Sequence, residues 1–394
     1  MILATSARAR VYLDYNASAP LRPVARAAME ATLDLQGNAS SVHGEGRAVR
    51  AVIEDARRQI AALLGAEPKN LIFVSGATEA ANLALTPFLR DKTGGCEVLL
   101  AGAGEHPCVL SGHGFASERF FEAPLGPQGV IDLAALERLL AAAPGRPMLA
   151  LQAANNETGA IQPMRLAADI VHARNGIVVC DAVQWAGRGP CDLKALGADA
   201  LLISSHKLGG PKGAGALALA DGLYFERGLI RGGGQERGAR GGTENALAIA
   251  GFAAAAREAF VTCNRQSLEL ADMRDRMEAT LQAGLPDIEI FSANTARLPN
   301  TSAFAVPGLA AETLLMALDL EGIAVSSGSA CSSGKVRPSH VLASMGVQDH
   351  ISRCALRISL GWASQPGDID RFCETFQRTV SRMLARRTHP VAGI

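Results

Sequence analysis

The segment SSHKLGGPKG places one lysine, Lys207, between a histidine and a run of glycines. A lysine on a solvated helix surface needs no such neighbours, whereas a lysine that meets a ligand in a tight pocket does. Its amine forms a Schiff base with a carbonyl group if the amine is neutral often enough. A nucleotide P-loop is the competing interpretation, but the segment lacks the four-residue gap and the Gly-Lys-Ser/Thr ending. Lys207 is therefore the first candidate catalytic residue.

Several polar side chains follow apolar runs that are typical of strands. Asp181 follows GIVVC, and a buried carboxylate there needs a partner: a cationic ring nitrogen of a cofactor, a structural salt bridge or a helix cap. Gln184, three residues later, is placed to bind the same ligand. His106 in EHPCV and Asn156 in QAANNETG follow two other strands. The alternatives for these two are an ordinary loop histidine and an Asn-rich turn.

Two segments offer groups that bind a phosphate. In SGATEAAN (75–82), the N–H groups at a helix start and the Thr78 hydroxyl form either an anion site or an ordinary N-cap. Ser204 and His206, just before Lys207, add further donors. Pyridoxal phosphate requires a lysine, a partner for its ring nitrogen, a phosphate cradle and a flat group over the ring. Taken together, these residues predict a pyridoxal 5'-phosphate (PLP) site.

Two residues in the last quarter of the chain extend this chemistry. Cys331 in SSGSACSSGK is surrounded by serines and glycines, which is typical of a polar loop rather than a core. Lys335 and Arg337 favour its thiolate, so the thiol is suited to take sulfur from one place and deliver it to another. The alternative is a surface cysteine without a role. Arg357 in LRISLG lies in a strand, either as a clamp for a substrate carboxylate or in a structural ion pair.

The order of the elements predicts the fold class. Apolar runs predict strands at 71–76, 97–102, 147–152, 176–184, 199–207 and 213–220, with helices following 71–76 and near 163–174. This alternation is typical of a mostly parallel sheet covered on both faces, where ligands bind outside the carboxyl ends of the strands. From residue 245 the pattern changes to a long helix (245–283), strands at 288–291, 300–306 and 355–361, and helices near 310–320 and 367–386.

The sequence thus predicts an α/β protein with a large domain (15–255) and a smaller α+β domain built from 1–14 and 256–394. The glycine-rich segment RGGGQERGARGGTEN (231–245) is expected to be a loop that approaches an anion or another subunit.

Composition excludes several classes of protein. The 394 residues include 38 Lys plus Arg and 38 Asp plus Glu, with 48% apolar residues, which describes a globular protein without the basic surplus of a nucleic-acid binder. The eight cysteines show no CxxC and no metal-ligand spacing, which favours a reducing compartment and no metal site. No apolar run reaches the roughly 18 residues of a membrane span, and the N-terminus lacks the hydrophobic region of a signal peptide. We expect a cytoplasmic protein with no nucleic-acid or membrane partner.

The chain resembles a cysteine desulfurase of the class V aminotransferase family from about residue 11 to residue 361. The motifs that carry the resemblance are, in order, VYLDYNASAP, GNASSVHGEGR, FVSGATEAANLAL, EHPCVL, ANNETGAIQP, CDAVQ, SSHKLGGPKG, GGGQERGARGGTEN, LPNTSAF, SSGSACSSG and LRISLG. The loop around Cys331 is similar to that of the subgroup with a long cysteine loop, which serves iron–sulfur cluster assembly or nitrogenase maturation.

The resemblance implies PLP-dependent transferase fold type I, with a mostly parallel seven-stranded sheet in the large domain. It also implies that the enzyme converts L-cysteine to L-alanine and transfers the sulfur, as a persulfide on Cys331, to an acceptor such as an iron–sulfur scaffold protein. The alternatives are another PLP-dependent lyase or aminotransferase, for example a selenocysteine lyase, and a non-catalytic scaffold of the sulfur machinery. Simple transamination needs no mobile thiol, and the intact Lys207, Asp181 and Cys331 argue against a scaffold.

The resemblance also assigns roles to individual residues. The catalytic residues would be Lys207, Cys331 and His106, with the His106 ring stacked on the cofactor. The cofactor would be held by Ala77, Thr78, Asn156, Asp181, Gln184, Ser204, His206 and Lys207, and by Thr243 of the second subunit of a homodimer. Asn156 and Arg357 would hold the substrate carboxylate.

Two features depart from the family pattern. Trp362 stands where a basic residue is expected, and NASAP has Ser18 and Ala19 where threonines are usual. We expect neither departure to touch the cofactor site, and Trp362 leaves the edge of the substrate pocket open.

Overall fold

The computed structural model describes residues 10–327 and 338–388. Within them, a central seven-stranded sheet has the strand order β2-β10-β9-β8-β7-β5-β6. Its strands are β2 (Leu71–Val74), β5 (Val98–Gly102), β6 (Phe120–Ala123), β7 (Pro147–Gln152), β8 (Ile177–Asp181), β9 (Ala200–Ser204) and β10 (Gly215–Leu219). The strands from β9 to β6 pair in parallel, and β10 runs antiparallel to both β9 and β2. The predicted mostly parallel sheet is therefore confirmed.

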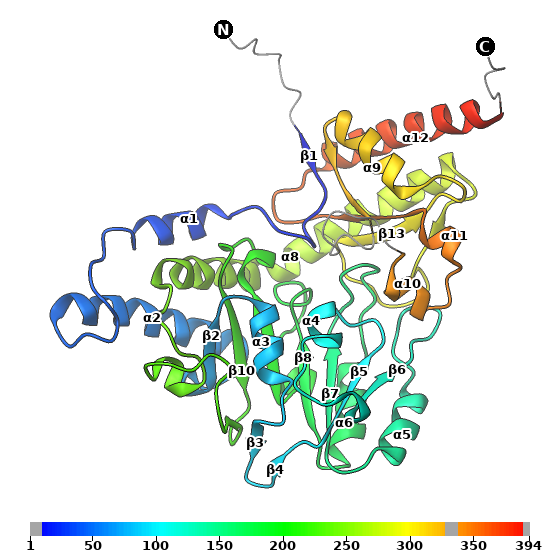
Figure 1. The fold of residues 1–394 in the computed structure, drawn as a ribbon. Helices are drawn as coiled ribbons and strands as arrows, with labels where there is room; N and C mark the ends of the chain where they lie inside the picture. The colour runs from blue at the N-terminus through cyan, green and yellow to red at the C-terminus, as the bar shows by residue number, and fades with distance from the viewer. Residues whose placement is uncertain (1–9, 328–337, 389–394) are drawn as a thin grey trace, which may run out of the picture.

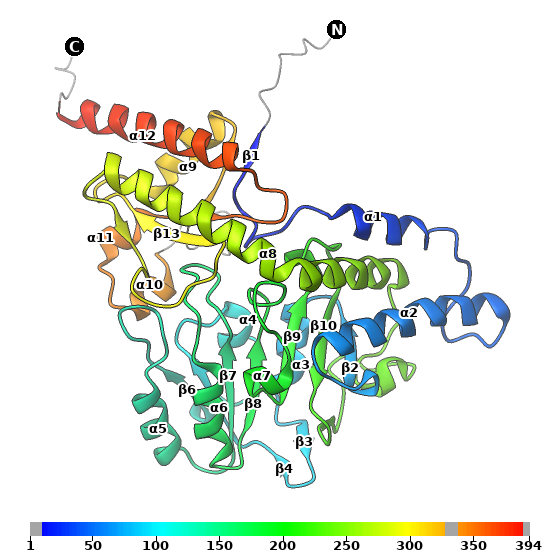
Figure 2. The same cartoon turned by 180° about the vertical axis from the view of Figure 1, so that it is seen from behind.

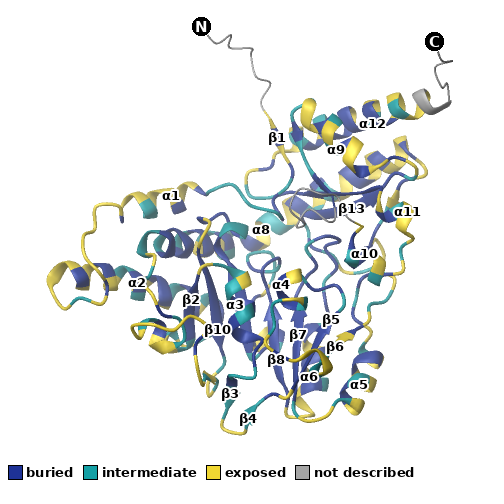
Figure 3. Ribbon diagram, viewed as in Figure 1, coloured by how far each residue is buried: buried dark blue, intermediate teal, exposed yellow. Residues whose placement is uncertain are grey.

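Helices cover both faces of this sheet, as Figures 1 and 2 show from opposite sides. One face carries α3 (Ala77–Ala84) and α4 (Pro107–Leu110). The other carries α2 (Gly44–Leu63), α5 (Leu133–Ala142), α6 (Met164–His172), α7 (Leu193–Leu196) and the first part of α8 (Ala246–Gly284). Helix α6 illustrates why: its buried residues Met164, Ala167, Ala168 and Val171 recur at helical spacing and form one apolar stripe. The strands themselves are buried throughout the sheet's centre (Figure 3).

A second, antiparallel sheet has the order β12-β13-β16-β15. It comprises β12 (Glu289–Ile290), β13 (Thr301–Ala305), β15 (Ser326–Ser327) and β16 (Ala355–Ser359). Its neighbours are α9 (Ala311–Leu320), α10 (His340–Ser344), α11 (Asp349–Ser352) and α12 (Pro366–Thr388). Strand β1 (Val11–Tyr12) pairs in parallel with β14 (Ile323–Ala324), so the start of the described chain joins this part of the molecule.

Separate hydrophobic cores support the division into domains 15–255 and 1–14 plus 256–394, which we propose. Val11 and Leu13 pack with Phe304, Phe372 and Phe376 rather than with the central sheet. Helix α8 belongs to both units, because its first half lies in the core of the central sheet and residues from Leu270 onward lie in the small core. A division at residue 255 would therefore fall inside a continuous helix.

Helix α8 is also the one helix of the described residues that is long and apolar enough to cross a membrane. It packs against α1 (Pro23–Glu30), α2 and α12, and half of its most apolar window is buried within the protein. We therefore interpret it as a core helix.

The remaining elements are short. They are β3 (Leu89–Asp91), β4 (Gly94–Gly95), β11 (Tyr224–Phe225) and four 3₁₀ turns, η1 (Pro68–Asn70), η2 (Ser117–Arg119), η3 (Ser205–Lys207) and η4 (Gln235–Gly238).

Candidate active site

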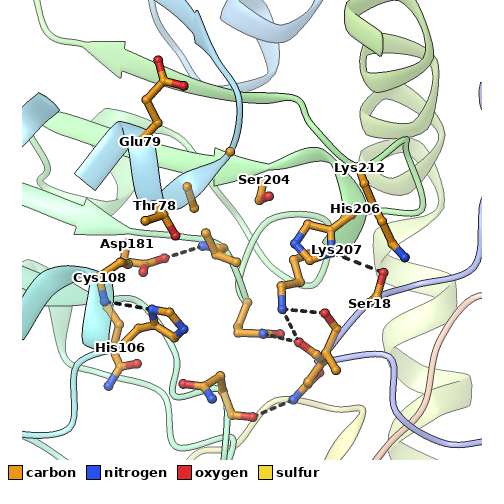
Figure 4. Close-up of a pocket in the computed structure, with 18 of the residues that line it drawn as sticks. Ser18, Thr78, Glu79, His106, Cys108, Asp181, Ser204, His206, Lys207 and Lys212 are labelled. Atoms are coloured by element: carbon orange, nitrogen blue, oxygen red, sulfur yellow. Dashed lines mark hydrogen bonds between the residues drawn. The ribbon is translucent and has the colours of Figure 1, made fainter. Parts of the chain in front are cut away.

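A cavity of about 660 Å³ opens at the carboxyl ends of the central strands (Figure 4). Ten residues predicted from the sequence line it: Ala77, Thr78, His106, Asn156, Asp181, Gln184, Ser204, His206, Lys207 and Arg357. They come from segments spread over 280 positions of the chain, from residue 77 to residue 357. The fold thus brings nearly the whole predicted set into one cavity.

Lys207 lies in the turn η3, directly after β9, and its side chain extends into the cavity (Figure 4). Its Nζ donates hydrogen bonds to the backbone oxygens of Asn16 at 2.6 Å and Ala17 at 2.9 Å. The amine therefore faces open volume and is held by carbonyl groups of the N-terminal segment.

Asp181 is the last residue of β8, and its carboxylate is almost completely buried. Burial raises its pKa to about 6, while a hydrogen bond from the Val183 N–H (2.9 Å) and the charge of Lys207 oppose that shift. Glu105, which accepts a bond from the Gln152 N–H at 2.7 Å, has its pKa raised well above the ordinary value by burial and by Asp181. Burial thus favours the neutral form of Glu105 more strongly than that of Asp181, and Asp181 is the carboxylate that lines the cavity, where a cationic ring nitrogen would stabilise it.

His106 is the N-cap of α4, and its Nδ1 accepts a hydrogen bond from the Cys108 N–H at 3.1 Å. This bond leaves the ring proton on Nε2. Burial, together with the charges of Lys207 and His340, lowers the pKa of His106 to about 4. The ring is consequently neutral at pH 7 and presents a flat surface in the cavity.

The groups predicted to bind phosphate gather in one part of the cavity (Figure 4). Ala77 and Thr78 are the first two residues of α3, whose N-cap Gly76 offers no side-chain bond to the free N–H groups. Ser204 ends β9, and burial and Lys207 lower the pKa of His206 to about 4. Helix N–H groups, a hydroxyl and a neutral imidazole are a donor set that suits an anion.

Arg357 enters from the small sheet and is buried. Its guanidinium donates to the Asn156 backbone oxygen at 3.0 Å and to Asp14 Oδ1 at 2.8 Å, while the buried Nε has no hydrogen-bond partner. The structural ion pair that the sequence left open therefore exists, and one buried N–H of the same group has no hydrogen-bond partner. Gln184 donates to the Asn16 oxygen at 3.0 Å and accepts from Arg188 at 2.9 Å.

Two predicted residues do not lie in this cavity. Thr243 is exposed on the glycine-rich loop and lines an adjoining hollow of about 250 Å³, which shares Ser75 and Gly213 with the main cavity. Cys331 falls outside the described residues.

Sequence reasoning missed several residues at the site. Asn16, Ser18, Glu79, Cys108, Gln152 and Lys212 also line the cavity. The expectation that the NASAP changes lie away from the site is wrong, because Ser18 Oγ lies 3.3 Å from His206 Nδ1. The family motif VYLDYNASAP contains both Asn16 and Ser18, and its polar residues are the signal that could have found them.

Trp362, in contrast, does not touch the cavity, as expected. It does not line the 660 Å³ cavity but a void of about 40 Å³ behind Lys207, together with Arg22 and Leu208. Among the described residues, no group of three or more His, Cys, Asp or Glu side chains is placed to hold a metal ion.

Comparison with known proteins gives the family. The family profile described as Aminotransferase class-V matches residues 11–372. The chain belongs to the cysteine desulfurase group of the class-V aminotransferase family. It is 36% identical to the cysteine desulfurase of Gluconacetobacter diazotrophicus, over 95% of this chain and 94% of that protein. It is 34% identical to the cysteine desulfurase IscS of Dictyoglomus turgidum, over 95% of each chain.

Solved structures of class-V relatives share the fold. A NifS-like protein from Rickettsia africae superposes with a TM-score of 0.85 at 32% identity, covering 94% of this chain and 99% of that one. SspA in complex with cysteine superposes with a TM-score of 0.72 at 27% identity, covering 89% and 98%. These neighbours confirm the predicted fold type I, and the cysteine desulfurases are in general PLP-dependent enzymes.

Proposed function

We propose that this chain is a PLP-dependent cysteine desulfurase that converts L-cysteine to L-alanine and keeps the removed sulfur on Cys331. The C–S bond of the substrate breaks, an S–S bond to Cys331 forms, and the thiol proton replaces sulfur on the alanine carbon. The reaction L-cysteine plus thiol gives L-alanine plus persulfide, so it needs no external oxidant or reductant. The observation that carries the proposal is the meeting of Lys207, Asp181 and His106 in one cavity with Arg357.

The described side chains fit the cofactor. Asp181 is a carboxylate whose pKa is raised by burial, and a cationic ring nitrogen beside it would favour its charged form. Ala77, Thr78, Ser204 and His206 supply neutral donors for a phosphate, and Lys207 supplies the amine for the aldehyde. Gln184 and Asn156 would bind the edge of the ring, and the neutral His106 would lie against its face. When bound, PLP withdraws electrons from the substrate Cα.

The roles of the chain's own groups follow from their placement. Arg357 and Asn156 would orient the substrate carboxylate, because both line the cavity and the guanidinium is a cation. Lys207, displaced by the substrate amine, would take the proton from Cα. Cys331 would attack the substrate sulfur as a thiolate. A reductant or a sulfur acceptor would then remove the outer sulfur of the persulfide from Cys331.

We further propose a homodimer, in which Thr243 of each chain completes the phosphate site of the other. The exposure of Thr243 on a loop beside the cavity supports this arrangement. The sulfur acceptor would be a protein such as an iron–sulfur scaffold, and the compartment would be the cytoplasm. Within the described residues, the seven cysteines are all free thiols and all buried, in keeping with a reducing compartment.

The decisive experiment measures L-alanine and sulfide released from L-cysteine, with and without a reductant. We expect equal amounts of both products with the reductant, and alanine limited to about one equivalent per site without it. Cys331→Ala should keep the absorbance of the bound cofactor and lose sulfide release. If this variant still mobilises sulfur at a near-normal rate, the persulfide role is wrong.

A further inference from the structure

The N-terminal segment 16–22, here called the strap, runs along the turn that carries Lys207. The Ala19 N–H donates to the His206 oxygen at 2.9 Å, and the Arg22 N–H donates to the Gly209 oxygen at 2.8 Å. Strap and turn are thus joined by backbone bonds on both sides of the lysine. The position of one therefore sets the position of the other.

The Arg22 side chain strengthens this connection. Its Nε donates to the Leu208 oxygen at 2.9 Å, directly after Lys207 in the chain, although the side chain is only 5% exposed. Burial lowers the pKa of Arg22, and the nearby Glu258 carboxylate, 3.4 Å away, opposes that shift. A buried cation is costly unless it is well partnered. Here the Leu208 oxygen and the Glu258 carboxylate are the partners that offset the cost of burying Arg22.

Trp362, from the small unit, is a further partner of Arg22, beside Gln266, whose Oε1 accepts a hydrogen bond from Arg22 Nη2 at 3.4 Å. The Arg22 guanidinium carbon lies 5.4 Å from the centre of the indole ring, within the range of a cation–π contact. The indole Nε1 also donates to the Pro20 oxygen at 3.0 Å. Trp362 therefore contacts the strap twice, once through its ring face and once through its N–H.

There is little room for the strap to move away from the lysine. Gly209 has a φ of +84°, and a Cβ at this position would lie 2.7 Å from Arg22 Cγ and 3.1 Å from Trp362 Nε1. The void between these groups and Lys207 measures only about 40 Å³, enough for about one water molecule. A shift of the strap thus requires Trp362 to move.

We propose that Arg22 and Trp362 are positioning residues for Lys207. Their contacts fix the strap against the turn. The Asn16 and Ala17 oxygens of the strap then hold the lysine amine at the edge of the cavity whenever the amine is not bonded to the cofactor. This inference rests on the proposed function, in which the substrate displaces Lys207. It also explains Trp362: the positive charge expected at position 362 is supplied by Arg22, stacked on the ring that stands there instead.

The test compares Trp362→Ala, Trp362→Phe, Arg22→Met and the double variant Arg22→Met with Trp362→Ala. The matched control is Trp185→Phe, because Trp185 also donates its indole N–H to a proline oxygen (Pro190, 2.7 Å) but lines a different hollow. Two quantities are measured on each dimer: the rate at which PLP, added to the cofactor-free protein, develops the absorbance of the lysine-bound form, and the kcat and KM for L-cysteine.

We expect Trp362→Ala and Arg22→Met each to slow formation of the lysine-bound form and to lower kcat by about tenfold, with KM within about twofold. Trp362→Phe keeps an aromatic face for Arg22 but loses the pyrrole ring with its N–H, so kcat should fall by about threefold at most. The double variant should lose no more than either single variant, because both act through one contact. Trp185→Phe should match the unchanged protein.

Unchanged rates in Trp362→Ala, or losses in the double variant that multiply, would overturn the positioning role. If Trp362→Ala does not fold, Trp362→Phe, Arg22→Met and their double variant are compared instead. Unchanged rates, or losses that multiply in the double variant, would again overturn the positioning role. Should the unchanged protein release no alanine from cysteine, the proposed function fails, but the absorbance kinetics still decide whether Arg22 and Trp362 position Lys207.

Discussion

The two sheets of this protein present their functional groups in different ways. In the central sheet, the site residues stand at strand ends or just beyond them: Asp181 ends β8, Ser204 ends β9, and His106 and Asn156 follow β5 and β7. In the small sheet, Arg357 is the middle residue of β16 and lies between its partners Ala303 and Ser326.

This difference has a physical origin. Parallel strands with helical crossovers collect loops and helix N-termini at one edge, where polar groups have room and N–H donors are free. In an antiparallel strand, alternate side chains face opposite sides, so Leu356 and Ile358 pack in the small core while Arg357 faces the cavity. Because the Arg357 side chain is buried, its charge needs a partner of opposite charge nearby. Asp14 is that partner.

The comparison predicts that changes at the central sheet abolish chemistry, whereas changes at the small sheet weaken substrate binding. Lys207→Ala removes the amine that bonds to the cofactor and takes the Cα proton, so turnover should fall by about a thousandfold or more. The lysine-bound absorbance should vanish as well. Alanine release measures the turnover, and an absorption spectrum measures the lysine-bound form. The control is Lys194→Ala, because Lys194 is exposed. Retained absorbance in Lys207→Ala would contradict the assignment.

Asp181→Asn tests the buried carboxylate of the central sheet. The amide still accepts the Val183 N–H but no longer balances a cationic ring nitrogen, so kcat should drop by about 10²–10³-fold. Glu105→Gln is the comparison, because burial raises the pKa of Glu105 and favours the neutral form that glutamine imitates. Its loss should be within about threefold. Equal losses in the two variants would mean that the pair acts only in packing.

Arg357→Lys tests the small sheet. A lysine keeps the charge but cannot match a carboxylate with two parallel N–H groups, so KM for L-cysteine should rise by about tenfold with little change in kcat. The cofactor spectrum should stay the same. Asp14→Asn separates the two roles of Arg357, since it removes the ion pair and leaves the guanidinium in place. If Asp14→Asn raises KM as much as Arg357→Lys, the ion pair alone accounts for the effect.

Glu157→Gln should produce the smallest effect, and it concerns the contact between the two units. The Ser339 hydroxyl, which also caps α10, donates to Glu157 Oε2 at 2.5 Å, and burial raises the pKa of Glu157 from 4.5 to about 7. Because the folded-state pKa is the higher one, the carboxyl's contribution is full below pH 4.5 and is lost as the pH rises through 7.

Glutamine accepts the same bond and does not titrate, so the variant should gain stability with rising pH. The gain is at most about 3 kcal/mol at pH 8 and smaller at pH 5, which corresponds to a few degrees in Tm. Thermal unfolding of the two proteins at both pH values measures it. A Tm difference that does not depend on pH would show that Glu157 is not the titrating group.

The sequence by itself determined most of the central sheet and its site. Six of its strands were located, because fully buried strands read as continuous apolar runs. β6 was not, since three of its four residues are only partly buried or exposed. Asp181, Ser204 and His206 were found for the same reason: a polar residue directly after a buried strand is conspicuous. Helix α2 was missed because its apolar residues are interleaved with charged ones.

Only the tertiary structure decided the antiparallel direction of β10, the ion pair of Arg357 with Asp14, and the contact of Trp362 with Arg22. Each of these depends on residues that lie more than ten positions apart, and for the last two more than three hundred. Local periodicity reports which side of an element is buried, but not against what. The strap is the clearest case, since its carbonyl oxygens hold Lys207 through backbone atoms that every residue type shares, and no side-chain pattern records them.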